Sequence, residues 1–110
     1  MRTAGVTLPP AELPATAARL RDEVRGFLAD ERAGSAFDPR CDAWLAGHSP
    51  EFSRKLGARG WLGMTWPARY GGGERTSQER FVVIEELLAA GAPVAAHWIA
   101  DRQVGPAILK

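Results

Sequence analysis

Residues 57–91 read GARGWLGMTWPARYGGGERTSQERFVVIEELLAAG, and this stretch decides the fold. Its second half predicts a helix over residues 76–91, because Thr76 and Glu79 form the capping box T-x-x-E just before the apolar residues 81–84. Apolar side chains cover more than half of the circumference of this helix, so we expect it to be central and packed on several sides.

A tryptophan-rich bend precedes that helix. Lys55 and Arg59 favour the end of a short helix, and Gly60 follows where only a residue without Cβ takes a positive φ at low cost. Four apolar side chains then stand in a segment that would otherwise be a solvated loop, namely Trp61, Leu62, Met64 and Trp66. We therefore expect the bend to pack onto another part of the protein.

The combination resembles the amino-terminal helical domain of the acyl-CoA dehydrogenases. In that family the pattern G-W/L-x-G-x-x-x-P-x-x-Y-G-G stands shortly before a helix containing E-E-L. The matching positions here are Gly60, Gly63, Pro67, Tyr70, Gly71, Gly72, Glu85, Glu86 and Leu87. The segment RLRDEVRGFLADE, residues 19–31, resembles the first helix of the family, so the resemblance covers residues 14–110.

The resemblance implies an all-α domain of about five helices, an orthogonal helical bundle, within a longer enzyme of lipid metabolism. That enzyme dehydrogenates an acyl-CoA at its α,β bond: a glutamate of a later domain removes a proton, and FAD accepts a hydride. FAD lies mainly against the other domains. The implied partners are the acyl-CoA substrate, those domains, a homo- or hetero-oligomer and an electron-transfer acceptor. We expect no catalytic residue in this chain, and we expect the isolated chain to be inactive.

The chain before the bend predicts two helices. Residues 1–13 lack periodicity and are expected to form a flexible arm, and Pro14 suits the first position of a helix. Leu20, Val24, Phe27 and Leu28 form an apolar stripe on this helix, which ends at Gly34. Residues 36–48 are expected to be irregular. The sequence Ser49-Pro50-Glu51 then starts a second helix, which buries Phe52 and Leu56.

The chain after Gly91 predicts short helical segments. Ala92 and Pro93 open one helical turn, and Asp101 is expected to cap a final segment. Gly105-Pro106 predicts a kink or a late helix start, because proline lacks an N–H. The sequence stops at Lys110 inside this helical pattern. We therefore expect residues 14–110 to be one domain truncated at its carboxyl end, in a fragment of a longer protein.

Composition excludes several classes of protein. The net charge is +1 with interspersed acids and bases, so nothing indicates binding to nucleic acid. Cys41 is the single cysteine, which excludes an internal disulfide and suits a reducing compartment. No apolar run approaches the ~20 residues that span a bilayer, and the first residues lack a signal-peptide core. We expect a cytoplasmic protein.

Other patterns that could carry chemistry favour structural roles. Residues 71–73 are three glycines, but a phosphate loop needs Gly-Lys-Ser/Thr or a preceding strand, so we expect a connector. Glu85 and Glu86 point about 100° apart, so one should be solvated and the other hydrogen-bonded at a packing seam. His97 and Asp101 are four residues apart, yet with His48 and Cys41 they match no zinc spacing, and we expect no metal.

The resemblance also implies a wall of the acyl pocket. In the family, the connection between the fourth and fifth helices lines the distal part of that pocket. The positions that correspond here are Ala95, Ala96, His97, Ile99 and Gln103. Ordinary core packing fits Ala95, Ala96 and Ile99 equally well. Arg102 and Gln103 are either polar groups of the same wall or exposed side chains. His97 departs from the common family pattern, which leaves the acyl group open.

Two functions from other classes remain open at this point. A non-catalytic interaction module would expose Trp61, Met64 and Trp66 as a partner surface. A helical DNA-binding domain is disfavoured, because the arginines are scattered instead of lining one helix.

Overall fold

The computed structural model describes residues 5–110, and this range contains helices joined by bends, with no β-strand. The elements are α1 (Ala15–Ala33), α2 (Ala43–Ala46), α3 (Pro50–Ala58), the 3-10 turn η1 (Ala68–Tyr70), α4 (Ser77–Ala89), α5 (Ala95–Ile99), the π-helical turn η2 (Ala100–Val104) and α6 (Gly105–Ile108). The expected all-α fold is confirmed. None of the helices in this range is long and apolar enough to cross a membrane.

The chain before α1 has no regular secondary structure. The expected arm, residues 1–13, begins with residues 1–4, which lie outside the described residues, and Val6 and Leu8 are exposed. Pro14 does not take the first helical position that we expected: its ψ of 148° is extended, so it precedes the helix, and Ala15 is the first helical residue. Gly34 ends α1 as expected.

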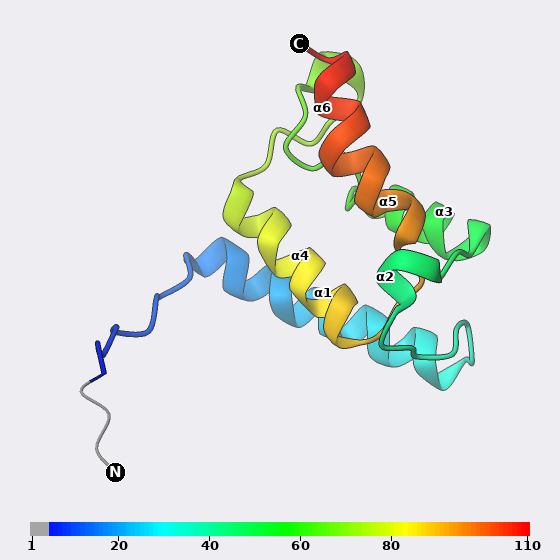
Figure 1. The fold of residues 1–110 in the computed structure, drawn as a ribbon, viewed down its shortest axis with the longest axis horizontal. Helices are drawn as coiled ribbons and strands as arrows, with labels where there is room; N and C mark the ends of the chain where they lie inside the picture. The colour runs from blue at the N-terminus through cyan, green and yellow to red at the C-terminus, as the bar shows by residue number, and fades with distance from the viewer. Residues whose placement is uncertain (1–4) are drawn as a thin grey trace.

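The pair of helices α1 and α4 carries the core and lies side by side in Figure 1. Leu20, Val24 and Phe27 of α1 are buried in one apolar cluster with Val83 and Leu87 of α4. These side chains repeat at helical spacing, so each helix presents one continuous apolar stripe to the cluster. The apolar stripe expected for the first helix is therefore confirmed.

Ion pairs border the seam between these helices. Nη2 of Arg25 lies 3.0 Å from Oε1 of Glu86, and Nε of Arg21 lies 3.5 Å from the same oxygen. The Glu86 side chain is only 11% exposed, whereas that of Glu85 is 47% exposed. The prediction of one solvated and one seam-bound acid is confirmed.

The expected enclosure of α4 is wrong for one face. Val82 and Val83 are buried, but Phe81 is 56% exposed and Leu88 is 38% exposed. Apolar residues surround most of this helix, whereas the described chain covers only part of its circumference. The uncovered face therefore keeps apolar side chains at the surface.

The tryptophan-rich bend packs into the core, as expected. Trp61 is 3% exposed and Met64 is 1% exposed, and the ring of Trp61 meets that of Phe27 edge-on at 5.2 Å. Gly60 has a φ of 75°, which lets the chain leave α3 in the direction of the core. Because Trp61 and Met64 are buried, they do not form the exposed partner surface of the interaction-module alternative.

Helix α2 is a correction to the expected irregular segment. It occupies Ala43–Ala46, and Ala43 is buried. The chain after it is tied to the start of α5, because Ala95 donates its N–H to the carbonyl of Gly47 at 3.0 Å. This tie to a distant segment holds a helix too short to be stable from its own sequence.

The segments α5, η2 and α6 follow each other as one helical rod (Figure 1). The N–H of Gly105 reaches the carbonyl of Ala100, five residues back, which is the π-helical pattern. Helix α6 then begins at Gly105 with Pro106 in its first turn, which is close to the expected late start, and the wider turn before it lets the rod continue. Asp101 does not cap a final segment, since its side chain instead accepts a hydrogen bond from Gly63.

Candidate functional site

An apolar cleft lies between α4 and the rod that begins with α5. The two elements diverge from the connection at residues 90–94, as Figure 1 shows. Residues at helical spacing face the cleft from both sides: Arg80, Val83, Ile84, Leu87 and Leu88 from α4, and Val94, His97, Trp98, Asp101 and Arg102 from the other side, with Trp61 and Leu62 between them. The cavity has a volume of about 30 Å³.

The lining changes character along the cleft. Leu87, Leu88 and Val94 stand near the connection where the two elements meet, and these residues are apolar. Arg80 and Arg102 stand at the opposite end, one on each side. Arg102 also covers the face of Trp98, with 4.6 Å from its guanidinium carbon to the ring centroid. One end of the cleft is therefore apolar, and the other end, which we call the mouth, is basic.

His97 is the one imidazole in the lining, and its protonation follows from its partner. Nε2 of His97 lies 2.7 Å from Oγ of Ser53, and that hydroxyl donates to the carbonyl of Ser49 at 3.0 Å. The hydroxyl oxygen is thus the acceptor, and Nε2 carries the hydrogen. Burial lowers the pKa of His97, and Asp101 opposes this with a smaller effect. The ring is therefore neutral near pH 7.

Asp101 and Trp66 hold the outer wall of the cleft in place. Oδ1 of Asp101 accepts the backbone N–H of Gly63 at 2.8 Å. The indole of Trp66 lies against Gly105 so closely that an added Cβ there would be 2.1 Å from Cζ2 of the ring. The π-helical turn is thereby fixed to the tryptophan-rich bend by one polar and one steric contact.

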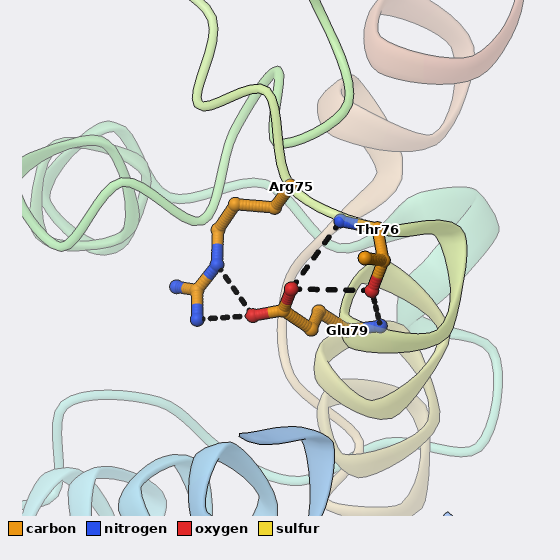
Figure 2. A network of polar contacts seen from close by, with 3 residues as sticks. All are labelled: Arg75, Thr76 and Glu79. Carbon is orange, nitrogen blue, oxygen red and sulfur yellow. Dashed lines mark hydrogen bonds and ion pairs between the residues drawn. The ribbon is translucent and has the colours of Figure 1, made fainter. Parts of the chain in front are cut away.

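The start of α4 is fixed by the expected capping box, which Figure 2 shows. Oγ1 of Thr76 accepts the N–H of Glu79 at 3.2 Å, and Oε1 of Glu79 accepts the N–H of Thr76 at 3.3 Å. Nε of Arg75 donates to the second carboxylate oxygen at 2.8 Å. Because Arg80 directly follows Glu79, this network also positions the mouth of the cleft.

Comparison with known proteins now places the chain. The family model described as acyl-CoA dehydrogenase, N-terminal domain, matches residues 14–110. The chain belongs to this family. Acyl-CoA dehydrogenase FadE26 of Mycobacterium tuberculosis (strain ATCC 25618 / H37Rv) is 29% identical over 94 residues, which cover 82% of this chain and 23% of that relative. No solved structure matches the chain significantly.

The positions implied by the acyl-CoA dehydrogenase resemblance fall on two sides of α5 and η2. His97 lines the cleft, and Ala95 is half-buried outside it. Ala96, Ile99 and Gln103 are exposed, and Ile99 is 56% exposed. Sequence reasoning missed Arg80, Ile84 and Trp98 as cleft residues, although their helical spacing was a usable signal.

The cleft and the glycine loop bear on which ligands this domain could hold. The cavity of the cleft is small, about 30 Å³, so any ligand larger than a few waters must displace side chains. The glycine loop offers no phosphate cradle, because the N–H groups of Gly71, Gly72 and Gly73 donate to the carbonyls of Ala68, Pro67 and Gly63. No group of three or more metal-binding side chains occurs in residues 5–110.

A second depression borders the cleft of this dehydrogenase domain. Cys41, Trp44, Leu88 and Trp98 line it, and Leu88 and Trp98 also line the cleft. The rings of Trp44 and Trp98 meet edge-on at 5.4 Å. Cys41 is exposed at its edge.

Proposed function

We propose that residues 14–110 form the amino-terminal helical domain of a flavin-dependent acyl-CoA dehydrogenase and supply one wall of its acyl pocket. The supporting observation is the cleft between α4 and α5, whose walls are mostly apolar, with His97 as a polar group between the apolar end and the mouth. An alkyl chain gains about 0.8 kcal/mol for each CH₂ that it buries, so such walls suit the acyl part of a thioester.

The wall has two parts. His97 faces the cleft, with Ala95 beside it, whereas Ala96, Ile99 and Gln103 face outward from the same helical segment. The exposed residues form the part that another domain of the enzyme covers. The small side chains of Ala95 and Ala96 would leave room for a bulky acyl group between this segment and that domain.

The reaction itself belongs to the rest of the enzyme. The acids Glu85 and Glu86 form ion pairs with Arg21 and Arg25, so neither is free to act as a base. We propose that the catalytic glutamate and the FAD site lie in the other domains, that the enzyme assembles as a homo- or hetero-oligomer, and that it passes electrons to a separate acceptor in the cytoplasm. This chain positions the substrate and carries no redox step.

Binding of an acyl-CoA to the 110-residue chain tests the proposal. Trp61 and Trp98 line the cleft, so their fluorescence reports its occupation. We expect octanoyl-CoA to bind at least tenfold more tightly than CoA, because burial of two CH₂ groups already supplies about 1.6 kcal/mol. Leu88→Glu should remove this difference, whereas Leu45→Glu, which changes an exposed leucine outside the cleft, should keep it. Equal binding of octanoyl-CoA and CoA would contradict the proposal.

A further inference from the structure

We propose that Arg80 and Arg102 form an anion-binding pair at the mouth of the cleft. The ligand of this site is then an alkyl chain that carries an anionic oxygen group, either a carboxylate or a phosphate. The inference rests on the proposed function for the alkyl part of the ligand, and it adds a polar anchor at the basic end of the cleft.

The residues that line the cleft are regularly spaced on both of its sides. The positions on α4 are 80, 83, 84, 87 and 88, and those on the other side are 94, 97, 98, 101 and 102. Both sets have the same intervals, so each side presents one helical face to the cleft. Arg80 is seven residues from Leu87, ~10 Å along α4, and Arg102 is eight residues from Val94 on the other side. Both arginines line the same cavity.

The charged residues of the lining favour an anionic ligand. Neither Arg80 nor Arg102 has a carboxylate partner among residues 5–110, whereas Arg75, in the preceding residues, is paired with Glu79. Asp101 is the only acid in the lining, and its Oδ1 already accepts the N–H of Gly63. The mouth thus holds two cations and one engaged anion, and it favours an anionic ligand.

The surroundings of the two arginines strengthen this preference. Arg80 is partly buried, and Arg102 is exposed but lies over the indole of Trp98. The partly buried Arg80 is less screened than a guanidinium in open water, and the fork of either arginine binds two oxygens of a carboxylate or phosphate at once. An alkyl chain must displace side chains from the nearly filled cavity, and Leu88, at the surface, is positioned to move.

The test compares three probes that share one alkyl chain: octanoate, octyl phosphate and octanol. Dissociation constants are measured by tryptophan fluorescence on the 110-residue chain. We expect both anions to bind at least tenfold more tightly than octanol. A preference for octyl phosphate indicates a phosphate-bearing ligand such as a coenzyme thioester, and a preference for octanoate indicates a carboxylate-bearing one.

Matched variants separate the two proposals. The double variant Arg80→Met, Arg102→Met should lose the preference for anions and keep octanol binding, whereas Arg54→Met, an exposed arginine on α3, should change neither. Circular dichroism checks that the helices persist. If octanol binds the unaltered chain as tightly as the anions do, the arginine assignment is overturned and the alkyl wall stands. If no probe binds, both proposals fall.

Discussion

The carboxylate of Asp101 and the backbone nitrogen of Gly63 are 2.8 Å apart, although 38 residues separate them in the sequence. This hydrogen bond joins the π-helical turn to the tryptophan-rich bend. Hydrogen bonds to charged groups contribute about 1.5–3 kcal/mol. Because Asp101 is only partly buried, we expect Asp101→Ala to lower the free energy of unfolding by about 1–2 kcal/mol in urea titrations.

Asp101→Asn keeps an acceptor oxygen, so it should cost less than Asp101→Ala. Asp38→Ala, at an exposed aspartate, is the matched control and should change stability little. Equal effects of Asp101→Ala and Asp38→Ala would show that the contact to Gly63 contributes nothing to stability.

Two glycine-to-alanine changes should have opposite effects. At Gly105 the added Cβ would lie 2.1 Å from Cζ2 of Trp66, whereas at Gly26 nothing lies within 4 Å. Overpacking typically costs 1–3 kcal/mol, so we expect Gly105→Ala to destabilise by about that amount. Gly26→Ala lies inside α1 and should stabilise by about 0.5–1 kcal/mol. Thermal or urea unfolding measures both.

A double-mutant cycle locates the cause of the Gly105→Ala effect. In a Trp66→Leu background the ring atoms that clash are absent, so the alanine should cost clearly less there. Additive effects of the two changes would place the strain elsewhere.

Glu79 should make stability depend on pH in the acidic range. Burial disfavours its charged form, but hydrogen bonds from Arg75 and from the backbone and hydroxyl of Thr76 outweigh this and lower its pKa. Ionised Glu79 contributes fully to the free energy of unfolding above the unfolded pKa of about 4.3. This contribution is lost as the pH falls through the lower folded pKa. Urea unfolding at pH values on both sides of about 4.3 should show this loss, and Glu79→Gln should flatten it. An unchanged profile in the variant would exclude the capping box as its origin.

His97 should make stability depend on pH in a higher range than Glu79 does. Its pKa is lowered chiefly by burial, so the unfolded chain binds a proton more readily than the folded chain does. The free energy of unfolding is therefore highest above the unfolded pKa of about 6.5, and it falls as the pH decreases from there toward the folded pKa. His97→Gln should remove this slope, whereas His48→Gln should keep most of it, because the charge of His48 lowers the pKa of His97 less than burial does. Unfolding free energies on both sides of about pH 6.5 measure the difference.

The isolated 110-residue chain should be catalytically inactive. The acids Glu85 and Glu86 are paired with arginines, and we place the catalytic glutamate and the FAD site in the other domains. We expect the purified chain to show no stoichiometric flavin absorbance and no acyl-CoA-dependent reduction of an electron acceptor. Either signal would overturn the assignment of the reaction to other domains.

The predictable features of this fold are those set by neighbouring residues. The capping box of Thr76 and Glu79, the start of α3 at Ser49 and the positive φ of Gly60 were all evident in the sequence. Each depends on contacts within about one helical turn, where residue type and spacing suffice. The apolar stripe of α1 was predictable for the same reason.

The missed features depend on contacts between distant segments. Helix α2 is held by the hydrogen bond between Ala95 and Gly47, and Asp101 bonds Gly63 instead of capping a helix. The exposed Phe81 shows the same limit, because periodicity reveals an apolar face but not whether anything covers it. The cleft could not be predicted from the sequence, because it depends on how α4 and α5 lie relative to each other. The residues of each side nevertheless recur at regular helical spacing.

The position of Cys41 makes the cleft convenient to observe. It is the only thiol in the 110 residues, and it stands at the rim of the depression that shares Leu88 and Trp98 with the cleft. A maleimide dye attached there would sit beside an indole donor without any prior removal of cysteines. Energy transfer between the two would then report, in real time, when a ligand enters the cleft beside Trp98.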